Sequence, residues 1–201
     1  MKAIILPAIV VGASLIAQAG HATEFTGPRL EVRLGHDHVA VDDNYPDVPG
    51  RLSGATLGAT LGYDRAVGDK TIIGVEASAL ASKTHASTSI DKDKLKLGSS
   101  RDFDLMVRIG RKVSKDTLVY AKAGYAYSRF SVTYESFIGT AYDVDGRHKN
   151  QGGARVAAGV EHAFNDKLFG VVEYRHTGYS GYLFDSDVTR GQVLFGMGLR
   201  F

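Results

Sequence analysis

Apolar and polar side chains alternate along most of the chain after residue 28. Alternation with a period of two is typical of β-strands that face two different environments. Eight segments show this pattern, and each offers about the 9–11 residues that a tilted strand needs to cross a bilayer. They are residues 29–38, 54–64, 71–82, 101–112, 118–130, 153–164, 168–179 and 189–201.

The polar faces of these segments carry five acidic and six basic residues. They are Glu31, Arg33, Glu76, Asp104, Arg108, Lys122, Arg155, Glu161, Glu173, Arg175 and Arg200. In a dry core each unpaired ion would cost several kcal/mol, which disfavours a soluble lipocalin-like cup or jelly roll. A membrane barrel has a polar interior, and eight strands enclose a space that their own side chains fill. We therefore predict that the apolar faces meet lipid and that the charges pair inside the barrel.

The connections between the segments alternate in length. Short turns follow the second, fourth and sixth segments ("DRAVGDK", "VSKD" and "FNDK"). Long polar stretches follow the first, third, fifth and seventh segments, at residues 37–50, 83–100, 132–153 and 180–189. Outer-membrane barrels sort their connections in this way, because periplasmic turns are tight and surface loops are free to grow. The predicted fold is all-β, an eight-stranded antiparallel up-and-down transmembrane β-barrel with both termini in the periplasm.

The N-terminus reads as an export signal. One lysine precedes about fifteen mostly apolar residues, and small-residue triplets follow. We predict a cleaved signal peptide at residues 1–22, with cleavage after Ala22 or alternatively after Ala19, and a barrel domain at residues 23–201. The apolar run contains Pro7 and is shorter than the roughly 20 residues of a spanning helix.

Composition alone describes an ordinary protein, with 44% hydrophobic and 23% charged residues and a mean hydropathy of −0.09. In a membrane barrel, however, lipid-facing and lumen-facing residues cancel in such averages. The absence of cysteine excludes disulfides and thiolate chemistry. The net charge of +2 comes without a basic block, so no nucleic-acid partner is expected.

Aromatic residues near the ends of the segments are placed as interfacial girdles require. Tyr63, Phe164 and Phe201 are predicted at the periplasmic rim. The opposite rim is predicted to carry Phe103, Tyr127 and Tyr179.

Three features of the sequence together resemble the Opa-like, or outer-membrane protein β-barrel, family of small eight-stranded barrels. They are the terminal "GMGLRF", the stretch "GVVEYRHTGYSG" and the eight-strand layout over residues 27–201. The resemblance implies that the last strand is read by the outer-membrane assembly machinery, with Gly196, Leu199 and Phe201 at its glycine and hydrophobic positions. The hydrophilic position of that signal falls on Leu194 or on Gln192.

The resemblance also implies the location and the partners. We expect the outer membrane of a Gram-negative bacterium, with contacts to its lipid and lipopolysaccharide and with host or environmental surface ligands at the loops. The predicted function is structural or adhesive. A narrow passive pore for small solutes is the alternative.

Chemical sites are weakly indicated. His36 and His38 share one face of a strand, but a third fixed metal ligand is lacking, so no metal or other cofactor is predicted. Lipid A deacylases, which are also eight-stranded barrels, place a serine two residues after a histidine on a late strand. Here Gly178 stands at that position and Ser180 lies four residues from His176, so we predict no enzyme activity.

Overall fold

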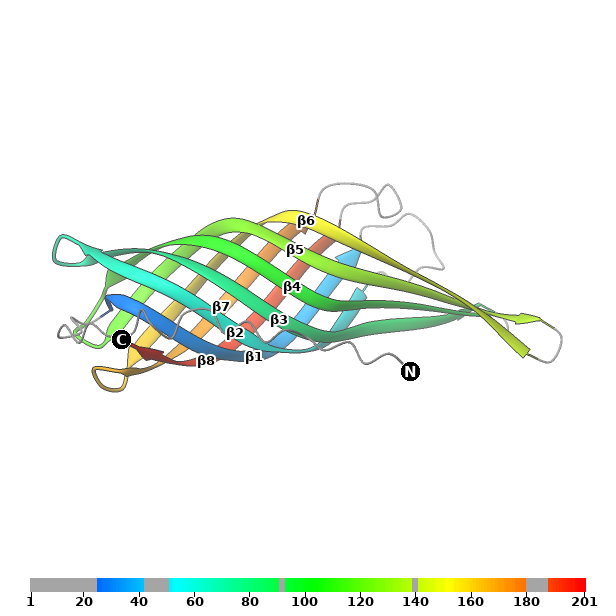
Figure 1. Ribbon diagram of the computed structural model, residues 1–201, viewed down its shortest axis with the longest axis horizontal. Coiled ribbons are helices and arrows are strands. Elements are labelled where there is room, and N and C mark those ends of the chain that lie inside the picture. Colours follow the sequence, from blue (N-terminus) through cyan, green and yellow to red (C-terminus); the bar gives the residue numbers. More distant parts are fainter. Residues whose placement is uncertain (1–24, 42–50, 91–92, 139–140, 180–187) are drawn as a thin grey trace, which may run out of the picture.

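Figure 1 shows a computed structural model in which eight antiparallel strands close into a barrel. The structure describes residues 25–41, 51–90, 93–138, 141–179 and 188–201. The strands are β1 (Gly27–Val41), β2 (Arg51–Val67), β3 (Thr71–Ile90), β4 (Asp93–Lys112), β5 (Thr117–Ile138), β6 (Ala141–Ala163), β7 (Leu168–Tyr179) and β8 (Val188–Arg200). Each pairs with the next in sequence, so the predicted up-and-down topology is confirmed. Nowhere in these ranges is there a helix long and apolar enough to cross a membrane.

The barrel closes by pairing its last strand with its first. Leu30 of β1 lies opposite Leu199 of β8, and the backbone N–H of Phe201 donates to the carbonyl of Pro28 at 2.9 Å. At this seam Gly27 has a φ of +101°, and a Cβ there would lie 2.3 Å from the carbonyl oxygen of Phe201. Closure leaves no strand edge unpaired within the barrel wall, as a structure immersed in lipid requires.

The two ends of the barrel differ. One end, which we call the terminal end, holds the C-terminus and three short turns at residues 68–70, 113–116 and 164–167 (left in Figure 1). At the other end, which we call the hairpin end, the β3–β4 and β5–β6 hairpins extend well beyond the barrel (right in Figure 1). The short turns predicted from the sequence are therefore present and lie together.

Two of the connections expected as long loops, residues 83–100 and 132–153, are instead strand over most of their length. Pairing of β3 with β4 continues to Ile90, and pairing of β5 with β6 continues to Ile138. Polar composition suggested loops, but an antiparallel hairpin that stands clear of lipid accommodates polar residues on both faces. The other two long connections, at residues 42–50 and 180–187, and the predicted signal peptide lie outside the described residues.

The two faces of the wall follow the predicted alternation. Outward side chains are apolar and open, with Leu105 67% and Leu61 62% exposed. The side chains that alternate with them point inward and are buried, and Arg33, for example, is 0% exposed. The interior is therefore a packed core in which charged and polar side chains lie among apolar ones such as Met106 and Leu194.

One aromatic position was predicted wrongly. Of the six predicted girdle residues, five point outward, but Tyr179 is 3% exposed and points inward. It packs edge-on against the ring of Phe130 at 5.3 Å between centroids. Tyr179 has the same parity as Glu173 and Arg175, so the strand alternation, rather than closeness to the rim, decides its direction.

An apolar layer closes the lumen at the terminal end. Phe25 lies just before β1 with a φ of +67°, and its side chain is buried against Ile72 and Leu118. Ala163 packs against the same group. A hydrophobic plug therefore occupies this end of the lumen, next to the charged residues Glu161 and Arg200.

Candidate functional site in the barrel lumen

Sixteen charged residues are buried in the lumen among the described residues, eight acidic and eight basic. They form two groups. The terminal-end cluster consists of Arg29, Glu31, Arg33, Asp64, Glu76, Arg108, Lys122, Glu161, Glu173 and Arg200. The hairpin-end cluster consists of Asp37, Asp102, Asp104, Arg155, Arg175 and Arg190. Each cluster contains equal numbers of acids and bases, so each is neutral when all its members are ionised.

Glu173 on β7 is the most heavily bonded carboxylate of the terminal-end cluster. Its Oε1 accepts from Arg33 Nη1 at 2.8 Å and from Arg175 Nε at 2.5 Å. Its Oε2 accepts from the hydroxyl of Tyr120 at 2.8 Å and pairs with Lys122 Nζ at 2.5 Å. Four donors from β1, β5 and β7 itself therefore meet one buried carboxylate, which satisfies both of its oxygens.

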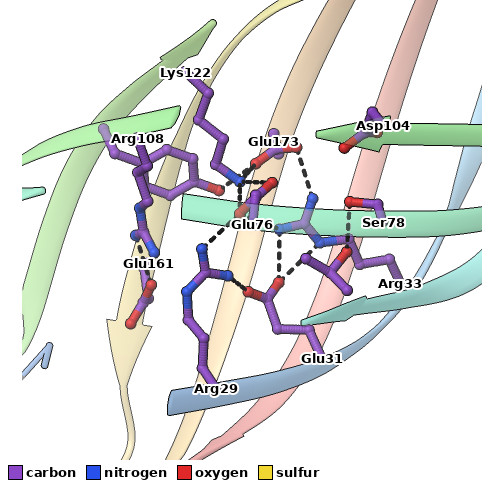
Figure 2. Close-up of polar contacts among 12 residues, drawn as sticks. Arg29, Glu31, Arg33, Glu76, Ser78, Asp104, Arg108, Lys122, Glu161 and Glu173 are labelled. Carbon is purple, nitrogen blue, oxygen red and sulfur yellow. Dashed lines mark hydrogen bonds and ion pairs between the residues drawn. The ribbon is translucent and has the colours of Figure 1, made fainter. Parts of the chain in front are cut away.

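Glu76 on β3 holds a second set of cations, shown in Figure 2. Lys122 Nζ lies 2.7 Å from both of its carboxylate oxygens, and Arg29 Nη2 donates to Oε2 at 2.6 Å. Arg29 also pairs with Glu31, and Arg33 Nη2 lies 2.7 Å from Glu31 Oε2. Because Lys122 bridges Glu76 and Glu173, the two carboxylates belong to one network.

A third part of this cluster lies at the terminal end. Glu161 accepts from Arg108 and from Arg200, each at 2.6 Å. Asp64 Oδ2 accepts a hydrogen bond from Arg29 Nε at 2.9 Å. It also accepts from Arg108 at 3.1 Å and from Arg200 at 3.2 Å. The guanidinium of Arg108 stacks 4.0 Å from the ring centroid of Tyr120, a cation–π contact that adds to the ion pairs.

The hairpin-end cluster is built from aspartates, arginines and hydroxyl groups. Arg155 donates to both oxygens of Asp102, at 2.8 and 2.9 Å, and to Asp104 at 2.7 Å. Arg190 pairs with both oxygens of Asp37. Ser128 donates to Asp102 at 2.6 Å, so a hydroxyl completes the shell of this carboxylate.

Arg175 joins the two clusters. Its Nε donates to Glu173 in the terminal-end cluster, and its Nη1 donates to Asp104 in the hairpin-end cluster at 2.6 Å. Nη2 donates to Ser78 at 3.3 Å and lies 3.7 Å from Glu76. The guanidinium fork thus reaches acids of both clusters through different nitrogens, which a lysine could not do.

Small residues provide space for these long side chains. A Cβ at Gly62 would lie 2.6 Å from the guanidinium carbon of Arg29. At Gly74 it would lie 2.0 Å from Asp64 Oδ1, and at Gly159 it would lie 2.6 Å from the hydroxyl of Tyr120. Glycine at these inward positions is therefore a packing requirement of the network.

The structure buries all eleven residues of the predicted lumenal set and brings them into contact with opposite charges. Sequence reasoning left out Arg29, Asp37, Asp64, Asp102 and Arg190, which are equally buried. Parity would have found all but Asp64, since each of the other four lies an even number of residues from a predicted lumenal residue on its own strand. The strand of Asp64, β2, holds no residue of the predicted set. Asp64 and Arg190 stand at the ends of predicted segments, where alternation is hardest to follow.

The residues of the proposed assembly signal lie at the seam. Leu199 and Phe201 point outward and are 46% and 40% exposed, while Gly196 faces inward, where a Cβ would meet Val171 at 2.5 Å. Both candidates for the hydrophilic position, Leu194 and Gln192, are fully buried in the lumen.

The histidines do not form a site with the residues that the structure describes. His36 and His38 point outward, whereas the intervening Asp37 points inward to Arg190. His176 also faces outward, as its register predicted, and Ser180 lies outside the described residues. Within the described part of the chain, no three metal-ligating side chains gather.

Comparison with known proteins identifies the fold and the family. The sequence-family model described as outer membrane protein beta-barrel domain matches residues 5–201. Neisserial surface protein A (NspA) is similar with a TM-score of 0.59 and 15% identity, over 88% of this chain and 98% of that one. OprG from Pseudomonas aeruginosa has a TM-score of 0.54 and 14% identity, over 89% of this chain and 98% of that one. Ail of Yersinia pestis has a TM-score of 0.51 and 12% identity, over 87% of this chain and 99% of that one.

At these identities the solved structures show the shared fold. Comparison with curated protein sequences gives no match. The family match extends over nearly the whole chain and agrees with the closed eight-stranded barrel, its apolar wall and its polar lumen. The chain therefore belongs to the outer membrane protein beta-barrel domain family.

Proposed function

We propose that the protein is a structural and surface-interaction component of the outer membrane, and that its barrel does not conduct. The observation that supports this is the neutral, fully buried charge network that fills the lumen, with the Phe25 layer at its terminal end. An eight-stranded barrel has just enough interior for its own side chains. Opening a path would require separating several buried ion pairs, each of which costs several kcal/mol if left unpaired.

Solute flux tests this proposal directly. Liposomes that contain the refolded protein should swell in small sugars and amino acids no faster than empty liposomes. A general porin of 16 or so strands, which has an aqueous channel, serves as the positive control. Swelling above the empty-liposome rate would instead establish the alternative, a narrow passive pore.

The hairpin end is the part that we assign to surface interaction. By the rule that short turns are periplasmic, the terminal end faces the periplasm and the extended hairpins face outward. Beyond Phe130, β5 continues for the eight residues Ser131–Ile138, which at about 3.3 Å per residue is about 26 Å. A rigid support that carries an extended sheet suits contact with lipopolysaccharide or with a ligand on another surface.

Protease treatment of intact cells tests this orientation. Cuts should map to the four long connections predicted from the sequence and to their hairpin extensions. The short turns at residues 113–116 and 164–167 should be protected until the outer membrane is opened. Cleavage of these turns in intact cells would reverse the assigned topology.

We also propose that the end of β8 acts as the assembly signal, with Gly196, Leu199 and Phe201 as its recognised residues. Deletion of Phe201 should lower the amount of heat-modifiable barrel in the outer membrane without altering export across the inner membrane. Phe201→Tyr, which keeps the aromatic ring, is the matched control and should assemble normally. Wild-type accumulation of the deletion variant would exclude this role for Phe201.

A further inference from the structure

A groove interrupts the apolar outer wall near the terminal end. Gly170 on β7 occupies an outward position between His162 of β6 and Met197 of β8. Gly170 lines a cavity of about 510 Å³ whose other walls are almost entirely apolar groups, Phe164 and Phe195 among them. Its size falls in the range of about 300–1,000 Å³ typical of ligand sites.

A second cavity, of about 380 Å³, lies at the adjoining rim. The short turns at residues 113–116 and 164–167 contribute Lys115, Asp116, Asp166 and Lys167 to its lining. Glu161 and Arg200 of the lumen also line this cavity, so three cations and three anions surround it. His162 and Phe164 line both cavities, so the apolar groove and the charged rim pocket meet at the end of β6.

His162 is held in place at this junction. A hydrogen bond of 3.1 Å joins its Nδ1 to Thr117 Oγ1, and its ring packs edge-on against Phe164 at 5.5 Å between centroids. The imidazole is exposed on the outer side of the wall. It therefore presents a polar edge at the depth where an apolar groove gives way to a charged rim.

We infer that these two cavities form a site for one phospholipid with a zwitterionic, primary-ammonium headgroup. The groove lies in the part of the wall that faces hydrocarbon, so an acyl chain is the occupant that its position and lining select. The rim pocket supplies lysines for the phosphate and aspartates for the ammonium group. By the same rule that places short turns in the periplasm, the lipid belongs to the periplasmic leaflet.

Headgroup selectivity follows from the mixed charges. A lipid with phosphate alone would find Asp116 and Asp166 repulsive, and a quaternary ammonium group would offer no N–H donor to their carboxylates. The site therefore differs from the rest of the wall, where lipid contacts only apolar side chains and any headgroup is equivalent.

Native mass spectrometry of the refolded protein tests the inference. Phosphatidylethanolamine, phosphatidylcholine and phosphatidylglycerol with identical acyl chains are titrated separately into the detergent-solubilised barrel. Phosphatidylethanolamine should bind with the highest apparent affinity. Gly170→Leu, whose side chain fills the groove, should lower that affinity about tenfold, as expected if contacts of about two methylene groups are lost.

Gly178→Leu is the matched control. Gly178 lies on the same strand and the same outer face but has open space around it and lines neither cavity. At Gly170 the nearest atoms to an added Cβ belong to the exposed ring of Phe164, at 3.1 Å, which can turn aside. Both variants should therefore fold, as heat modifiability on gels would show.

The Asp116→Asn, Asp166→Asn double variant separates the headgroup from the chain. It removes the carboxylates that would pair with the ammonium group, so it should abolish the preference for phosphatidylethanolamine over phosphatidylcholine and leave the acyl contacts intact. Equal affinity of the native barrel for all three lipids would overturn the inference. Equal loss of binding in the Gly170→Leu and Gly178→Leu variants would overturn it as well.

Discussion

The two lumenal clusters neutralise charge in different ways. All eight strands contribute to the terminal-end cluster, from Arg29 on β1 to Arg200 on β8, and four of its five acids are glutamates. The hairpin-end cluster takes its charges from only five strands, and all three of its acids are aspartates. Hydroxyl groups of Ser82, Ser128 and Thr177 complete its hydrogen bonding.

This difference indicates different roles in folding. The terminal-end cluster is satisfied only when every strand is in place, because carboxylates such as Glu173 draw their donors from β1, β5 and β7 together. A partly closed sheet would leave several of its ions unpaired at a cost of several kcal/mol each. The cluster thus favours closure of the whole barrel, while the hairpin-end cluster is a smaller local network.

The largest effect is expected from Glu173→Ala. It removes one carboxylate from three cations and from Tyr120, so an uncompensated positive charge stays buried. We expect the free energy of unfolding to fall by about 3–5 kcal/mol. The chain has no tryptophan, so far-UV circular dichroism and the gel shift in urea titrations are the suitable measurements. The outward change Val172→Ala on the same strand is the control, and wild-type stability of Glu173→Ala would show that water fills the lumen.

A smaller loss is expected from Asp102→Asn in the hairpin-end cluster. The amide keeps the shape of the side chain but loses the ionic pairing with both nitrogens of Arg155. Asp104 stays beside Arg155 at 2.7 Å and compensates part of its charge. The expected decrease is about 2 kcal/mol, the range of one charge-assisted hydrogen bond. A loss equal to that of Glu173→Ala would contradict the distinction between the clusters.

Ser128→Ala should cost less still. The hydroxyl donates to Asp102 and is shared with Tyr179 at 2.7 Å, but no charge is removed with it. About 1 kcal/mol is expected for a neutral partner in a buried hydrogen bond. The same urea titration measures it, with Ser128→Thr as a variant that keeps the hydroxyl. Equal losses in the two variants would show that packing, and not hydrogen bonding, is responsible.

The smallest expected quantity is the coupling between clusters. Glu161 pairs with Arg108 and Arg200, whereas the partners of Ser128 named above, Asp102 and Tyr179, lie outside the terminal-end cluster. The losses from Glu161→Ala and Ser128→Ala should therefore add to within about 0.5 kcal/mol. The pair Glu173→Ala and Asp104→Ala, which shares Arg175, should deviate from additivity by more. Additivity in both double-mutant cycles would remove Arg175 as the link.

Much of this architecture could be read from the alternation of side chains. Six of the eight predicted segments lie within the observed strands, the other two overrun β6 and β8 by one residue each, and the direction of His176 followed from its register. Tyr179 was misplaced because it was judged by its distance from the rim instead of by its parity. The hairpin extensions were missed because cross-strand pairing, and not local polarity, decides whether a polar tract forms strand.

The sequence by itself determined the number of strands, the face on which each side chain lies and the need for a lumen of balanced charge. These follow from a period of two, which is a local property of the chain. Only the tertiary structure decided which charges pair, since Glu173 and Arg33 are 140 residues apart in sequence and meet across the closed barrel. Such pairs depend on the stagger between strands and on the closure of β8 against β1, and no short-range pattern records either of these.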